Sequence, residues 1–172
     1  KESEHLFFKL SSLDNQIIDW LENSKIQEPV RNKLNEWLDG ELKDWDISRD
    51  SPYFGFLIPG YDDKYFYVWL DAPIGYLASH KNYLKKNNND SYFEEFWKKD
   101  SSTELFHFIG KDIMYFHTLF FPVMLENADL KTPDGVFVHG FLTLNGEKMS
   151  KSRGNFISAE NYINNLDPNY IR

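Results

Sequence analysis

The sequence of 172 residues contains no cysteine, which excludes disulfides and thiolate metal sites within these residues. No apolar run approaches the roughly 18 to 20 residues that a helix needs to cross a bilayer, and residues 1–4 do not have the pattern of a signal peptide. Basic residues are the minority, because 19 Lys and Arg stand against 27 Asp and Glu, for a net charge of −8. Any contact with nucleic acid must therefore be local. We expect a soluble, cytoplasmic protein with no zinc site in this part of the chain.

Aromatic side chains, in contrast, are abundant. The sequence has 15 Phe, 10 Tyr and 5 Trp, and its hydrophobic content is 41%. This composition is ample for a core and too apolar for a disordered segment. The length fits one well-buried domain, or one domain with a small appendage.

The first fifty residues predict a helical hairpin. A short strand over residues 5–10 precedes two helices, and Pro29 stands in the first turn of the second one. The apolar spacing gives each helix a packing face. Residues 41–64 look irregular, and we place a module boundary near Asp50, so that residues 1–50 and 51–172 form two domains.

Beyond Asp50 the pattern alternates between strands and helices. The predicted strands cover residues 65–71, 105–109 and 137–141, and the predicted helices cover 74–83, 92–99 and 113–124. Such alternation indicates an α/β fold with a parallel sheet. Ligands of these sheets bind at the carboxyl ends of the strands. That rule predicts that three segments meet at one rim: 71–76, 110–117, and the segment from 139 to the lysine loop at 148–152.

The lysine loop is a dense cationic segment in an otherwise acidic chain. Its residues are Lys148-Met149-Ser150-Lys151-Ser152. Two mobile ammonium groups, serine hydroxyls and backbone amides suit a loop that closes over a polyphosphate. The alternative is a solvated basic turn. The segment is not a Walker A loop, because G-x-x-x-x-G-K-[ST] is absent.

The other two rim segments allow a functional and a structural interpretation. Trp69 and Tyr76 can line a pocket, but for these aromatics taken alone ordinary core packing is the better explanation. Asp112 can cap a helix or accept hydrogen bonds from a ligand. His117 lies on an apolar helix face, where a histidine is usually a core residue. The histidines do not have metal-ligand spacing.

Taken together, the motifs closely resemble those of the bacterial methionyl-tRNA synthetases, a family of class I aminoacyl-tRNA synthetases. The lysine loop is the second signature of class I as a whole, whereas the Trp69–Tyr76 segment with Phe116-His117 is specific to the methionine enzymes. The matching segments are 45–50, 52–56, 65–76, 108–112, 115–117, 138–140 and 148–152.

The resemblance implies roles for particular residues. The residues matched to the methionine pocket are Trp69, Ala72, Pro73, Tyr76, Ile113, Phe116 and His117, with the Tyr76 hydroxyl near the thioether. The residues matched to ATP binding are Lys151, Lys148, Met149, Gly110, Asp112 and His139. Lys151 and Lys148 are also the expected catalytic residues, and Arg49 lies in a further matching motif. An apolar, aromatic pocket suits the soft methionine side chain.

The implied reaction is the activation of methionine with ATP and Mg²⁺ as substrate, followed by transfer of the methionyl group to tRNA(Met). The H-I-G-H signature of class I is absent from the sequence, as are the amino-terminal half of the catalytic fold and the anticodon-binding domain. We therefore interpret the chain as a central fragment. Residues 1–50 would be the tail of the connective insertion and residues 51–172 the carboxyl-terminal half of a Rossmann-like catalytic domain. We expect the fragment alone to be inactive.

Two alternatives remain at this point. The chain could belong to a class I synthetase for another amino acid, such as leucine, isoleucine, valine or cysteine. It could also be a non-catalytic nucleotide-fold module that retains the loop.

Overall fold

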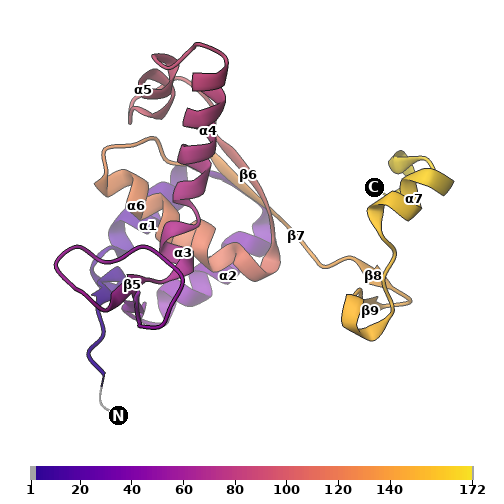
Figure 1. The fold of residues 1–172 in the computed structure, drawn as a ribbon, viewed down its shortest axis with the longest axis horizontal. Helices are drawn as coiled ribbons and strands as arrows, with labels where there is room; N and C mark the ends of the chain where they lie inside the picture. The colour runs from indigo at the N-terminus through magenta and orange to yellow at the C-terminus, as the bar shows by residue number, and fades with distance from the viewer. Residues whose placement is uncertain (1–2, 172) are drawn as a thin grey trace. The chain divides into compact units, whose positions relative to one another are not determined.

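The computed structural model describes residues 3–171 and divides into two compact units, one reaching to Val138 and one beginning at His139. The first unit contains helices α1 to α6, and the second contains the hairpin β8–β9 and helix α7 (Figure 1).

The first unit is built from short strands and from helices of up to 13 residues. The strands of the first unit are β1 (Phe7–Phe8), β2 (Lys25–Ile26), β3 (Trp45–Asp46), β4 (Ser48–Asp50), β5 (Lys64–Phe66), β6 (Phe106–Gly110) and β7 (Gly135–His139), the last of which ends at the unit boundary. Its helices are η1 (Leu10–Ser12), α1 (Asp14–Asn23), α2 (Glu28–Asp39), α3 (Val68–Asp71), α4 (Ile74–Lys86), α5 (Tyr92–Trp97), η2 (Lys111–Ile113), η3 (Phe116–Phe120) and α6 (Phe121–Asn127). The second unit has β8 (Thr143–Leu144), β9 (Glu147–Lys148), η4 (Lys151–Arg153), α7 (Ala159–Asn165) and η5 (Pro168–Ile171).

A parallel sheet of order β2-β7-β6 confirms the predicted α/β class. In its β2–β7 pair, Lys25 lies opposite Gly135 and Ile26 opposite Val136. Glycine is required in this register, because a Cβ atom at Gly135 would lie 2.7 Å from the carbonyl oxygen of Lys25. Strand β2 was not predicted. Its two residues are too few to give a periodic signal, so only the pairing with β7 identifies it.

One core joins the helices of the first fifty residues to the sheet. Leu10, Ile17 and Leu34 are completely buried together with Leu119 and Val136. Each such side chain stabilises the fold by about 1.5 to 3 kcal/mol relative to exposure. Residues before and after Asp50 therefore share one packed body. The assignment of residues 1–50 to a connective insertion stays a prediction.

The predicted strand over residues 65–71 is wrong in its second half and in its partner. Only Lys64–Phe66 is a strand, and it pairs antiparallel with β4 outside the parallel sheet. Val68–Asp71 forms the short helix α3. The β-rich composition of this run reflects packing, because the rings of Trp45 and Tyr67 meet edge to face at 5.6 Å. The pairing of β4 with β5 also corrects the irregular structure predicted for residues 41–64.

The predicted helix over residues 113–124 exists as three segments with different hydrogen bonding. A 3-10 turn (η2) is followed by a π-helical turn (η3) and then by α6. Pro122 explains part of this change, because it has no N–H to donate to the carbonyl of Thr118 in an α-helical register. The widened turn contains both Phe116 and His117, and π turns of this kind are frequent at functional sites.

Candidate functional site

Trp69 and Phe116 form a stacked pair in the first unit. Their ring centroids are 4.7 Å apart and the ring planes differ by 6°. Trp69 comes from α3 and Phe116 from the π turn, so the contact joins the Trp69–Tyr76 segment to the 110–117 segment. Such a pair contributes about 0.5 to 1.5 kcal/mol beyond the area that it buries.

A chain of hydrogen bonds joins Tyr76 to the same π turn. The hydroxyl of Tyr76 lies 2.9 Å from Nε2 of His117, and Nδ1 of His117 lies 3.0 Å from the carbonyl oxygen of Ile113. A carbonyl oxygen only accepts, so Nδ1 must carry the proton and donate. Neutral Nε2 then accepts from the Tyr76 hydroxyl. Because the Tyr76 hydroxyl donates its only proton to His117, it can only accept a hydrogen bond from a ligand.

Burial keeps His117 neutral. His117 is 1% exposed, and burial lowers its pKa despite the hydrogen bond to Ile113, which acts in the opposite direction. Burial also raises the pKa of the Tyr76 hydroxyl. A neutral imidazole and a neutral phenol disfavour a charged ligand side chain at this point and suit an apolar one.

His107 is a second buried histidine beside this pair, and it was not predicted as part of the site. Its ring centroid lies 5.4 Å from that of Tyr76 and 5.6 Å from that of His117. Burial, together with the neighbouring His117, lowers the pKa of His107 to about 4. Its Nδ1 is buried and has no hydrogen-bond partner within residues 3–171. The alternation along β6, where His107 and Ile109 face inward and Phe108 faces outward, was the signal that could have located it.

Trp45, from the matching segment 45–50, is a further aromatic neighbour to which the sequence analysis assigned no role in the site. Its ring centroid lies 5.4 Å from Phe116 and 3.9 Å from Phe120. Both partners come from the π turn, whereas Trp45 comes from the short strand β3. No periodic pattern links residues this far apart, so the contact could be found only in the folded chain.

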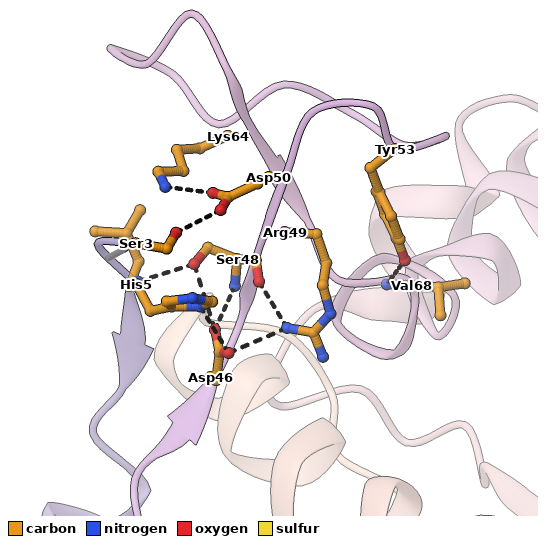
Figure 2. Close-up of polar contacts among 10 residues, drawn as sticks. Ser3, His5, Asp46, Ser48, Arg49, Asp50, Tyr53, Lys64 and Val68 are labelled. Carbon is orange, nitrogen blue, oxygen red and sulfur yellow. Dashed lines mark hydrogen bonds and ion pairs between the residues drawn. The ribbon is translucent and has the colours of Figure 1, made fainter. Parts of the chain in front are cut away.

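Arg49, in contrast, lies in a network of ionic contacts on β3, β4 and β5 (Figure 2). Its guanidinium group stands 3.9 Å from the centre of the Tyr67 ring and 3.2 Å from the Asp46 carboxylate. The same carboxylate lies 2.9 Å from Nδ1 of His5. Ring and carboxylate together fix the guanidinium as a preorganised cation.

The second half of this network ties β4 to β5. Lys64 and Ser3 both donate hydrogen bonds to the carboxylate of Asp50, as Figure 2 shows. The Lys64 bond, supported by the Ser3 bond, lowers the pKa of Asp50 to about 2, and the same contact raises the pKa of Lys64. Asp50 is therefore ionised through the physiological range, and its contact with Lys64 joins strands β4 and β5.

The remaining predicted residues of the first unit have simpler surroundings. Pro73 is buried and Ala72 is exposed at the start of α4. Gly110 ends β6, and its backbone precedes the 3-10 turn that contains Asp112. The capping role expected for Asp112 is not observed: that turn has no side-chain cap, and the exposed carboxylate makes no hydrogen bond within the described residues. It is therefore available to an external partner.

The lysine loop belongs to the second unit. Its first part is β9, which pairs with β8 across a turn at Asn145 and Gly146, both with positive φ (53° and 82°). The Lys148 ammonium lies 3.5 Å from the centre of the Phe141 ring, and the Lys151 ammonium lies 5.3 Å from that of Phe156. Both lysines are exposed. Of the other two residues matched to ATP, Met149 is half-buried and donates its N–H to the Leu142 carbonyl, while His139 is exposed at the start of the unit.

The first unit has two cavities, one beside Tyr76 and His107 and one beside α3 and α4. One of about 340 Å³ lies along β6 and is lined by Tyr76, His80, Phe96, Trp97, Leu105, Phe106, His107, Phe108 and Ile109. A second of about 590 Å³ is almost wholly apolar and is lined by Phe8, Phe56, Phe66, Leu70, Asp71, Ile74, Gly75, Ala78 and Met124. Burial raises the pKa of Asp71 at the edge of the second cavity.

Two further features are absent from residues 3–171. No group of three or more His, Asp or Glu side chains there is arranged to hold a metal ion. None of the helices in the described part is both long and apolar enough to cross a membrane.

Comparison with known proteins gives consistent results. A family model described as tRNA synthetases class I (M) matches residues 1–172. The chain is similar to Mycobacterium tuberculosis methionyl-tRNA synthetase in complex with methionyl-adenylate, with 34% identity, a TM-score of 0.70, and coverage of 92% of this chain and 30% of that one. The free-state structure of the mycobacterial enzyme matches with 30% identity, a TM-score of 0.60, and coverage of 82% of this chain and 28% of that one. The chain thus spans less than a third of the length of these enzymes.

Proposed function

Because the chain belongs to the class I tRNA synthetases of the M family, we propose that the intact protein is a methionine-tRNA ligase. In this proposal the methionine carboxylate attacks the α-phosphorus of ATP, the bond to the β-phosphate breaks, and pyrophosphate leaves. The methionyl group of the adenylate then passes to the terminal adenosine of tRNA(Met). ATP enters with Mg²⁺, and the reaction takes place in the cytoplasm.

The observation that carries the proposal is the wall formed by Trp69, Phe116, Tyr76 and His117. The stacked rings offer a flat apolar surface, and the hydrogen-bonded Tyr76–His117 pair offers one hydroxyl oxygen and no charge. An unbranched, polarizable thioether suits such a surface. The binding energy of one methylene or branch distinguishes similar apolar side chains by about 1 to 3 kcal/mol. We propose that Ala72, Pro73 and Ile113 complete this wall, as the family resemblance implies.

The lysine loop supplies the electrostatic part of the proposed reaction. Negative charge accumulates on the leaving pyrophosphate, so a cation that tightens on it stabilises the transition state more than the ground state. We assign this role to Lys151, with Lys148 as its helper. Met149, Gly110, Asp112 and His139 are proposed to contact the nucleotide, and the exposed Asp112 carboxylate is free to accept hydrogen bonds from ribose or from the methionine ammonium.

We further propose that the 172 residues alone do not form the adenylate. Class I catalysis uses the H-I-G-H signature as well as the lysine loop, and that signature is not in the sequence. Adding the isolated chain to methionine, ATP and labelled pyrophosphate should give no exchange. Robust exchange from the chain alone would overturn this part of the proposal.

The amino-acid specificity is tested by ATP/pyrophosphate exchange in the intact protein. We expect methionine to stimulate exchange at least a hundredfold more efficiently than leucine, isoleucine, valine or cysteine. Equal or better stimulation by one of these would identify a different class I synthetase. No stimulation by any amino acid would favour a non-catalytic nucleotide-fold module.

A further inference from the structure

Asn155 holds the two ends of the lysine loop together with its side-chain amide. The backbone N–H of Ser150 donates to Oδ1 of Asn155 at 3.0 Å, and Nδ2 of Asn155 donates to the carbonyl oxygen of Lys148 at 3.1 Å. Ser150 and Asn155 also form an isolated antiparallel bridge. One partner can only donate and the other can only accept, so the orientation of the amide is determined by its surroundings.

The segment between these contacts is a closed turn. The N–H of Arg153 donates to the Ser150 carbonyl and the N–H of Gly154 to the Lys151 carbonyl, each at 3.3 Å. Gly154 has a φ of 75°, a left-handed conformation that favours glycine. The Ser150 and Ser152 hydroxyls lie 2.9 Å apart across the turn. Residues 148–155 thus form a preformed turn with Lys151 at the start of its single helical segment, η4.

The lysine side chains are held more weakly than the backbone. Within the described residues, neither the Lys148 nor the Lys151 ammonium forms an ion pair with a carboxylate, and each lies over an aromatic ring. An exposed cation–π contact is worth about 0.5 to 1 kcal/mol. A phosphate group can therefore draw the ammonium groups away from the rings while the backbone of the turn stays in place.

We propose that Asn155 is a positioning residue of the lysine loop. By joining the Lys148 carbonyl to the Ser150 N–H, it fixes the backbone from which both lysines extend, so that little loop ordering remains to be done when the charge on pyrophosphate develops. This inference rests on the proposed function and adds a residue that the family resemblance did not assign. Preorganised cations stabilise a transition state without reorganisation at the moment of reaction.

The test compares Asn155→Ala with Asn165→Ala in the intact synthetase. Asn165 is a matched control, because its amide also donates to a backbone carbonyl of the same unit, that of Asn161 at 2.7 Å, but outside the loop. From the net contribution of two partly exposed hydrogen bonds, Asn155→Ala should lower kcat/KM for ATP by about tenfold in pyrophosphate exchange. The KM for methionine should stay within twofold, and Asn165→Ala should change neither value.

A second measurement reports loop order without relying on activity. Limited trypsin digestion, followed by mass spectrometry of peptides that end at Lys151 or Arg153, should show cleavage several times faster in Asn155→Ala than in wild type and Asn165→Ala. Unchanged kcat/KM for ATP together with unchanged cleavage would overturn the inference. An equal loss of kcat/KM for methionine and for ATP would also overturn the inference, because it would indicate general damage to the protein.

Lys151→Ala separates this inference from the proposed function. If Lys151→Ala retains full exchange, the catalytic role proposed for the loop is wrong, whatever Asn155 does to its order. If Lys151→Ala loses exchange while Asn155→Ala keeps both activity and slow cleavage, the proposed function stands and the role of Asn155 is wrong.

Discussion

Replacing His107 should make the protein less sensitive to acid. His107 is only 9% exposed, its ring stacks on Phe121 with centroids 5.6 Å apart, and its Nδ1 has no hydrogen-bond partner among residues 3–171. Burial and His117 together lower its pKa from an ordinary 6.5 to about 4. Between these two values the unfolded chain binds a proton that the folded chain does not. Stability therefore falls as the pH decreases through this window.

The size of the effect follows from the two pKa values. With 6.5 in the unfolded state and about 4 in the folded state, the contribution of His107 to the free energy of unfolding decreases by about 2 kcal/mol between pH 7 and pH 5. The total loss approaches about 3 kcal/mol below pH 4. In addition, the unpaired Nδ1 costs stability even at pH 7, on the order of 1 kcal/mol, because a buried polar atom has lost its water.

Two variants separate these contributions. His107→Leu removes both the titration and the unpaired nitrogen, so it should be about 1 kcal/mol more stable than wild type at pH 7 and should lack the 2 kcal/mol acid loss. His107→Gln removes the titration but keeps a buried polar side chain, so it should lack the acid loss without the gain at pH 7. The measurement is urea unfolding followed by tryptophan fluorescence, at pH 7 and pH 5. If all three proteins lose the same free energy between these pH values, His107 is not a buried neutral base and the reasoning is refuted.

Three other substitutions test the sheet and the site. Lys151→Ala should raise the barrier of pyrophosphate exchange by about 3 kcal/mol and so slow exchange roughly a hundredfold. The KM for methionine should stay within twofold of wild type, and an unchanged exchange rate would reject the catalytic role of Lys151. Tyr76→Phe leaves Nε2 of the buried His117 unpaired and should raise the methionine KM by about tenfold, with the ATP KM unaffected; equal effects on both substrates would contradict this. Gly135→Ala should lower the free energy of unfolding by about 2 kcal/mol in urea, because the new Cβ would lie 2.7 Å from a carbonyl oxygen of the adjacent strand. Gly75→Ala, with no atom within 4 Å of the new Cβ, is its control and should cost nothing.

The strong local patterns of the sequence were sufficient for part of the fold. The helix predicted over residues 74–83 is α4, and the strand predicted over 105–109 is β6, displaced by one residue. Apolar periodicity over a long helix and a continuous apolar run between polar segments are signals that tertiary contacts rarely override. The strand predicted over residues 65–71 was wrong in its second half, because its β-branched and aromatic residues pack equally well from the helical turn at Val68–Asp71.

The sequence by itself determined the family of the chain, its α/β class and the residues to examine, because motifs such as Lys148–Ser152 and Trp69–Tyr76 are read residue by residue. Only the tertiary structure decided how those residues interact. The pairing of Tyr76 with His117, the stacking of Trp69 on Phe116 and the buried position of His107 join segments far apart in the chain. Such contacts depend on burial and on exact distances across the core, and neither quantity leaves a local pattern in the sequence.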